Sequence, residues 1–158
     1  MKVEESIFIS RSPEDVFAFL VVRKNDPVWM AAVVESEWLE PPAGDTDTQI
    51  SIGRRGRMVM KNMGRRLEFV DEVADYEPGR RIAHRTVEGP IQLDTACLAE
   101  PAADGCRATV LGETDNLIGG PFGKLANPIA ARLVRRGFKT DLARLKNLLE
   151  AEVRDGDE

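Results

Sequence analysis

The sequence contains few of the residues that build metal centres and disulfide frameworks. Its 158 residues include one histidine, His84, and two cysteines, Cys97 and Cys106. Two cysteines are too few for a structural zinc site, and a single histidine excludes a metal centre held by several imidazoles. We therefore expect no metal and no other cofactor.

Long hydrophobic runs are also missing. No stretch of about 18 apolar residues occurs, so we expect no membrane span. The first residues include Glu4 and Glu5 where a secretion signal has a basic start and an apolar stretch, and we therefore expect a cytoplasmic protein. A net charge of -5 argues against a nucleic-acid partner. Neither a glycine-rich phosphate loop nor a nucleophile elbow occurs.

What the chain does contain is the composition of one globular domain. Hydrophobic residues make up 42% and charged residues 31% of the sequence, which suits a chain that closes its own core. We expect a single domain over residues 1–152, followed by an acidic carboxyl-terminal tail over residues 153–158.

The amino-terminal residues predict one strand and two short helices. Residues 2–10 alternate between apolar and polar side chains with the period of a strand. Ser12 and Pro13 then fit the N-cap and the first position of a helix that runs to about Leu20. Asn25 starts a second short helix, whose apolar members include Trp29.

From Val33 onward, short strands alternate with turns. The turns are predicted at residues 41–45, 62–64, 77–79, 88–90 and 103–105, where proline, glycine, aspartate and asparagine gather. With the first strand this gives seven strands, and the short connections imply an antiparallel meander. The longest strands, over residues 49–61 and 64–76, should curve, with Gly53 and Gly56 supplying a bend.

The last long segment, residues 121–152, predicts an amphipathic helix that lies across the sheet. Asn127 and Pro128 fit its N-cap and first position. The glycine-rich residues 119–123 are either a hinge that lets the segment through Asn127 move as a gate, or a flexible loop without a role. Apolar residues before Phe138 should roof a cavity, and those after it should anchor the helix. Asp141 falls within the apolar arc, so we expect it to bond to a backbone group or an arginine.

This order of elements resembles the helix-grip fold of the START-like (SRPBCC) superfamily, in its polyketide cyclase and dehydrase branch. The resemblance spans residues 2–150. It is carried by residues 12–17, by Trp29 after Asp26 and Pro27, by residues 64–66 and 76–81, and by residues 138–150. It implies an α+β fold, in which a curved seven-stranded antiparallel sheet wraps around the long helix and two short helices lie between the first two strands. It also implies a cavity for an apolar ligand between sheet and helix.

Strand parity predicts which side chains line that cavity, because alternate residues of a strand share one face. The inward sets are largely apolar, with a small polar group. Together with apolar residues of the helices, they give the following candidate ligand-binding residues: Trp29, Trp38, Met58, Met60, Phe69, Ile82, His84, Thr86, Leu93, Thr95, Cys97, Val110, Phe122, Ile129 and Leu133.

Two polar residues of the inward sets leave alternatives open. His84 either orients or activates a ligand carbonyl, or is a core histidine bonded to a threonine or a backbone group. Asp71 either faces solvent, or is buried and needs a cation or a proton. Cys97 is expected to be a buried hydrophobe without an activated thiolate.

The sequence supports three functions. The first is binding or carriage of a small hydrophobic molecule of the lipid, polyketide or isoprenoid type. The second is a polyketide cyclase or aromatase, in which His84 with Thr86 or Thr95 promotes aldol closure and dehydration. The third is a protein or ribosome interaction module that uses a basic ridge on the last helix, although a solvated face accounts for that ridge better. The sequence predicts no oligomeric state.

Overall fold

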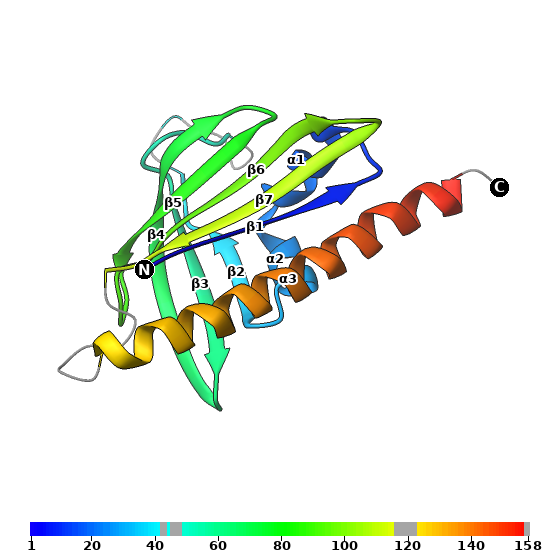
Figure 1. The fold of residues 1–158 in the computed structure, drawn as a ribbon. Helices are drawn as coiled ribbons and strands as arrows, with labels where there is room; N and C mark the ends of the chain where they lie inside the picture. Colours follow the sequence, from blue (N-terminus) through cyan, green and yellow to red (C-terminus); the bar gives the residue numbers. More distant parts are fainter. Residues whose placement is uncertain (42–43, 45–48, 116–122, 157–158) are drawn as a thin grey trace.

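A computed structural model describes residues 1–41, 44, 49–115 and 123–156. Its elements are, in order, β1 (Lys2–Ile9), α1 (Pro13–Leu20), the 3-10 helix η1 (Arg23–Asn25), α2 (Asp26–Trp29), β2 (Val33–Trp38), β3 (Arg55–Asn62), β4 (Arg65–Glu77), β5 (Arg81–Glu88), β6 (Asp94–Ala102), β7 (Gly105–Glu113) and α3 (Gly123–Gly156). In Figure 1 a curved sheet arches over α3, with α1 and α2 beneath it.

The seven strands form one antiparallel sheet in the order β1-β7-β6-β5-β4-β3-β2. The first strand therefore pairs with the last, so that Val3 lies opposite Gly112 and Ile9 opposite Cys106. The α+β helix-grip architecture expected from the sequence is confirmed.

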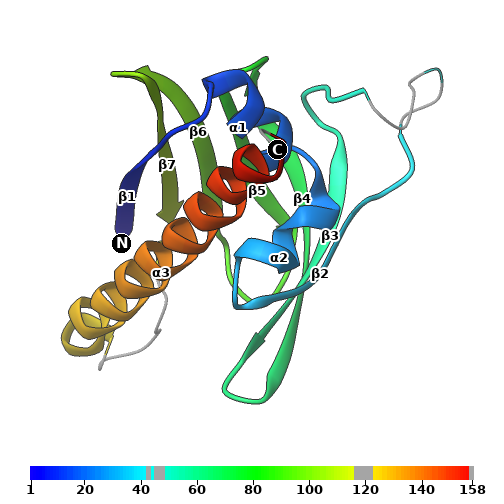
Figure 2. The same cartoon turned by 90° about the vertical axis from the view of Figure 1, so that its right-hand side faces the viewer.

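The first helix forms where the sequence predicts it. The Ser12 hydroxyl accepts a hydrogen bond from the backbone N–H of Asp15 at 3.1 Å, and Pro13 occupies the first turn, where its missing N–H costs nothing. The next two helices are single turns, and they lie against the inner side of β2 (Figure 2). They bring Arg23 and Asp26 beneath the sheet, where both side chains are buried.

The predicted strand over residues 49–61 is shorter than expected, because it begins at Arg55. Residues 49–54 instead turn at Gly53, which has a φ of 89°. The chain still hydrogen-bonds to β4 there, through Gly53 N–H to the Val73 carbonyl (2.8 Å) and Val73 N–H to the Arg54 carbonyl (2.9 Å). This turn places Arg54 inside the fold.

The bounds of the last helix differ from the prediction at both ends. It begins at Gly123, so Pro128 lies inside the helix rather than at its first position. Pro128 has no N–H, so the carbonyl four residues earlier receives no helical hydrogen bond from it. The helix ends at Gly156, within the expected tail. Of the gate expected over residues 119–127, residues 119–122 lie outside the described residues, and residues 123–127 belong to the start of α3.

The carboxyl-terminal half of α3 is fixed to the rest of the molecule. The Arg11 guanidinium donates to the carbonyl of Leu149 at 2.7 Å. The Asp141 carboxylate accepts from the backbone N–H of Ala31 at 3.1 Å, as the sequence predicted for this residue. The Phe138 ring packs on Gly112, 3.1 Å from the position that a Cβ would occupy.

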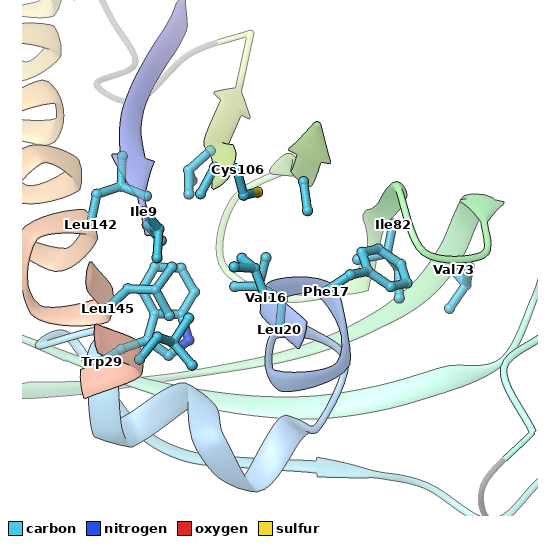
Figure 3. Packing of buried hydrophobic residues seen from close by; sticks show 14 residues of the cluster. Ile9, Val16, Phe17, Leu20, Trp29, Val73, Ile82, Cys106, Leu142 and Leu145 are labelled. Atoms are coloured by element: carbon cyan, nitrogen blue, oxygen red, sulfur yellow. The ribbon is translucent and has the colours of Figure 1, made fainter. Parts of the chain in front are cut away.

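The hydrophobic core lies between the sheet, α1 and this half of α3. Figure 3 shows Leu142 and Leu145 pointing toward Ile9 and Trp29, and Phe17 pointing toward the sheet. Leu145 and Ile9 are completely buried. Burial of a side chain of this size stabilises the fold by roughly 1.5–3 kcal/mol. In the described part of the chain, no helix is both long and apolar enough to span a membrane.

Candidate functional site

The inner face of the sheet carries the side chains that strand parity predicts. Ile82 and Val110 belong to the core, and Cys97 packs against it. His84 lies opposite Thr95 in the ladder between β5 and β6, and opposite Val73 in the ladder between β4 and β5. Because opposite residues of a ladder share a face, this places His84 and Thr95 on the inner side.

Two arginines are buried against the ring of Trp38. The Cζ atom of Arg23 lies 4.5 Å from the ring centroid and that of Arg54 lies 4.9 Å from it. Arg23 is 5% and Arg54 is 2% exposed. A guanidinium over a tryptophan face is attracted by the ring, most strongly where water is excluded. The inner face therefore holds two positive charges.

Asp71 is the carboxylate partner of Arg23. The two side chains form a buried ion pair and hydrogen bond. Of the two interpretations left open by the sequence, the structure thus supports a buried Asp71 paired with a cation. Burial raises the pKa of Asp71, while the guanidinium of Arg23 opposes that shift.

Gly56 makes room for this ion pair. A Cβ at this position would lie 2.5 Å from Nη1 of Arg23, well inside van der Waals contact. The sequence predicted that Gly56 bends the strand, but here the glycine lets a guanidinium approach the backbone closely.

Asp26 is a second buried carboxylate in the same region. The Ser36 hydroxyl donates to it at 2.6 Å. Burial raises the pKa of Asp26 to about 6, although the hydrogen bond from Ser36 and the charge of Arg23 both lower it. The net charge of the buried cluster formed by Arg23, Asp26 and Asp71 therefore changes near pH 6.

His84 is held neutral. Burial and the nearby Arg23 lower the pKa of His84 to about 3. Its Nε2 atom is buried and has no hydrogen-bond partner among the described residues. Its ring lies 6.0 Å from that of Trp38. A neutral imidazole can orient a ligand, but it supplies no proton near pH 7.

The Thr86 hydroxyl is hydrogen-bonded to the backbone of Leu93. Its hydroxyl donates to the carbonyl of Leu93 at 2.9 Å and accepts from the N–H of Leu93 at 3.2 Å. These two bonds hold the end of β5 to the segment before β6. Because the hydroxyl is engaged on both sides, Thr86 has little capacity to assist chemistry at His84.

Several other buried polar atoms have no hydrogen-bond partner among the described residues. They include Nε and Nη1 of Arg23 and Nε1 of Trp29. Leaving a buried donor unsatisfied costs about 1–3 kcal/mol, and more for a charged group. The site thus presents donors that an oxygen of a bound molecule would satisfy.

An apolar strip extends from the arginines along β3 and β4. Met58 lies opposite Phe69, and Met60 lies opposite Leu67. Phe69 is buried, whereas Met58, Met60 and Leu67 are only half-buried, as is Leu93. Half-buried apolar side chains on a concave face are suited to contact with an apolar ligand.

The remaining candidate residues lie elsewhere. Trp29, a candidate ligand-binding residue, is 1% exposed and belongs to the hydrophobic core. Ile129 and Leu133 do not face the sheet: they are 62% and 65% exposed, because α3 turns Ala130 and Phe138 toward it instead. Phe122 lies outside the described residues. Cys97 is half-buried rather than fully buried, and desolvation raises the pKa of its thiol to about 12.

The hollows found on the described residues also differ from the expected cavity. One, of about 310 Å³, is bordered by Lys24, Glu35 and Arg57 at the edge of the sheet. The other, of about 290 Å³, is bordered by Arg81, Arg85 and Asp94, and also by two candidate residues, His84 and Thr95. No described residue of α3 borders either hollow.

Sequence reasoning did not identify Arg23, Arg54 or Asp26 as members of the site. Arg23 and Asp26 belong to single-turn helices, which are too short to show a periodic apolar face. One available signal was Gly56, since an isolated glycine within a strand often marks the close approach of another group.

The fold has known relatives. A family model described as polyketide cyclase / dehydrase and lipid transport matches residues 1–150. Among solved structures, a Thermus thermophilus protein is 18% identical, with a TM-score of 0.77, over 96% of this chain and 99% of its own. An aromatase/cyclase from a Streptomyces species is 18% identical, with a TM-score of 0.73, over 97% and 95% of the two chains. A START superfamily protein from Mycobacterium smegmatis is 16% identical, with a TM-score of 0.64, over 93% and 98%. No curated protein matches.

Proposed function

Since the chain belongs to the polyketide cyclase / dehydrase and lipid transport family, we propose that it binds a small apolar molecule carrying an oxygen acceptor. The acceptor is a carbonyl, enol or carboxylate oxygen, and it is held by Arg23. The apolar body of the ligand lies along the half-buried strip that includes Met58 and Met60.

One observation carries this proposal: Arg23 is buried, and two of its nitrogen atoms have no hydrogen-bond partner among the described residues. Asp71 and the Trp38 ring fix the guanidinium in place. A guanidinium presents its donors in one plane, so those that Asp71 does not engage are already oriented for an oxygen. A fixed donor loses little conformational freedom when the ligand binds.

Probe displacement tests the role of Arg23. A fluorescent apolar probe is bound first and then displaced by a series of medium-chain carboxylates and by the alcohols of equal length. The wild-type protein should prefer each carboxylate, because a charge-assisted hydrogen bond to arginine is about twice as strong as a neutral one. Replacement of Arg23 with methionine should abolish that preference.

Arg57 provides the matched control for this experiment. It lies on β3 near Gly56, but it forms exposed ion pairs with Glu35 and Glu68. Arg57→Met should therefore leave the preference unchanged. Equal preference in both variants, or no binding of any probe by the wild-type protein, would contradict the proposal. Native mass spectrometry of protein purified without denaturation then identifies the ligand by its mass.

The cyclase alternative has one supporting observation. A guanidinium beside a neutral His84 would stabilise the negative charge that develops on a ketone oxygen during aldol closure. The assay is turnover of a poly-β-ketone by the His84→Ala variant. If this variant keeps ligand affinity but loses turnover shown by the wild-type protein, the protein is an enzyme rather than a carrier.

A further inference from the structure

The amino-terminal half of α3 exposes two large apolar side chains. Ile129 is 62% and Leu133 is 65% exposed. The two lie one helical turn apart, so they form a continuous stripe on the helix surface. Beside this stripe lie basic side chains that are exposed and form no ion pair with the described part of the chain: Arg132, Arg136 and Lys139.

The tip of the β3–β4 hairpin also exposes an apolar side chain beside basic ones. Met63 is 95% exposed and has a φ of 49°, and Gly64 follows with a φ of 79°. A two-residue hairpin with positive φ at both positions favours asparagine, aspartate or glycine first, and methionine is unfavourable there. Fold stability therefore does not account for Met63. Lys61 and Arg65 flank it, and both are exposed.

These two features lie at one end of the molecule. In both views the hairpin tip and the amino-terminal half of α3 extend toward the same lower end (Figures 1 and 2). Around the hairpin tip, residues 61–66 contain three basic residues, and residues 123–140 of α3 contain five, while neither segment contains any of the chain's 27 acidic residues. This end is therefore positive although the whole chain has a net charge of -5.

We propose that this end docks on the surface of an anionic lipid bilayer. The docking surface, called here the basic apolar end, consists of Lys61, Met63, Arg65, Ile129, Arg132, Leu133, Arg136 and Lys139. Aliphatic side chains that project among lysines and arginines suit a bilayer, because the apolar groups enter the acyl boundary while the cations remain among anionic headgroups.

RNA fits this surface less well. Proteins that bind single-stranded nucleic acid place aromatic side chains between their basic residues, so that bases stack on them. The basic apolar end contains no aromatic residue. The proposal goes beyond ligand binding and is independent of it, since vesicle binding is measurable whether or not Arg23 holds a ligand.

Vesicle cosedimentation tests the proposal. The full chain is mixed with vesicles of phosphatidylcholine alone, or of phosphatidylcholine and phosphatidylglycerol in equal amounts. Binding should be specific to the anionic vesicles and should weaken as salt is raised. Arg132→Gln should lower the affinity about fivefold, which is the effect of one basic side chain near an anionic surface.

The apolar side chains are tested by the double variant Met63→Asp with Leu133→Asp. It should lose about tenfold or more of its affinity for anionic vesicles. Ile52→Asp is the matched control, because Ile52 is 68% exposed but precedes β3, at the opposite end of that strand from Met63. This control should bind like the wild-type protein. Circular dichroism checks that each variant is folded.

Several results would overturn the proposal. One is equal binding to neutral and anionic vesicles, and another is undiminished binding by the double variant. A third is absence of vesicle binding together with salt-sensitive retention of a single-stranded RNA oligomer, which would assign the surface to nucleic acid. A fourth is a dimer in solution that the double variant converts to a monomer without any vesicle binding, which would assign the surface to a second copy of the chain.

Discussion

Replacement of Gly56 with alanine probes how tightly the buried ion pair is packed. The new methyl group would lie 2.5 Å from Nη1 of Arg23, and an atom cannot remain at that distance. The guanidinium must shift, and any shift disturbs its contacts with Asp71 and with the ring of Trp38. Because the site is buried, the moved charge cannot regain full hydration.

The magnitude follows from the cost of disrupting a buried ion pair. Loss of one partner typically lowers the free energy of unfolding by about 3–5 kcal/mol, because it leaves an uncompensated charge. That is a large fraction of the roughly 5–15 kcal/mol by which a domain is stable. Urea unfolding, followed by tryptophan fluorescence, measures the change. Gly137→Ala is the control: nothing lies within 4 Å of a Cβ there, and alanine should stabilise the helix by about 0.5–1 kcal/mol.

A double-mutant cycle separates the clash from a general effect of alanine in a strand. In the Arg23→Met variant the methionine side chain is flexible and uncharged and can move aside. Gly56→Ala should therefore lower the free energy of unfolding much less in that background. The coupling energy should exceed about 1 kcal/mol. A Gly56→Ala protein that unfolds within about 0.5 kcal/mol of the wild-type protein, or a cycle without coupling, would refute the described packing of Arg23.

Three further predictions concern the core and the titrating groups. Leu145→Ala should lower the free energy of unfolding by about 2–5 kcal/mol because it leaves a cavity, whereas Leu133→Ala should change it by less than about 0.5 kcal/mol; comparable losses in urea unfolding would contradict this. His84 has a lower pKa in the folded state, about 3, than its ordinary 6.5, so its contribution to stability is complete above pH 6.5 and is lost as pH falls toward 3. Asp26, whose pKa is raised from 3.8 to about 6, acts in the opposite direction in the same range. His84→Gln should therefore make the slope of melting temperature against pH more negative between about pH 4 and 6, and an unchanged slope would count against a neutral His84 in the folded protein. Cys97, with a pKa of about 12, should react with iodoacetamide far more slowly in the native protein than in urea, as mass spectrometry of the labelled peptide would show; similar rates would mean that the thiol is accessible.

The sequence predicts the order of elements and the inner faces of the strands well, because both depend on local periodicity and turn chemistry. Strand parity placed Asp71 with Phe69 and Val73 on the inner face, and all three are buried there. Parity does not reveal the partner of a buried charge. The Arg23 that pairs with Asp71 lies 48 residues earlier in the chain, in a single-turn helix, and only the tertiary structure brings the two together.

The orientation of a long helix is also poorly determined by its own sequence. Ile129 and Leu133 fall within the apolar arc of α3 and were expected to roof a cavity. The observed rotation is instead set by contacts that a helical wheel does not contain, namely Phe138 on Gly112 and Asp141 on the Ala31 backbone. The apolar residues at the start of α3 are left exposed as a result.

The pairing of β1 with β7 has a consequence for the kinetics of folding. Val3 meets Gly112, and Ile9 meets Cys106, across most of the length of the domain. Closing so long a loop costs chain entropy before any contact compensates for it, so we expect slow folding, typical of chains with many non-local contacts. During synthesis, Ile9 and Val16 remain exposed to water until β7 and α3 have emerged from the ribosome. The nascent chain therefore exposes these core residues at the stage when it is most prone to aggregation.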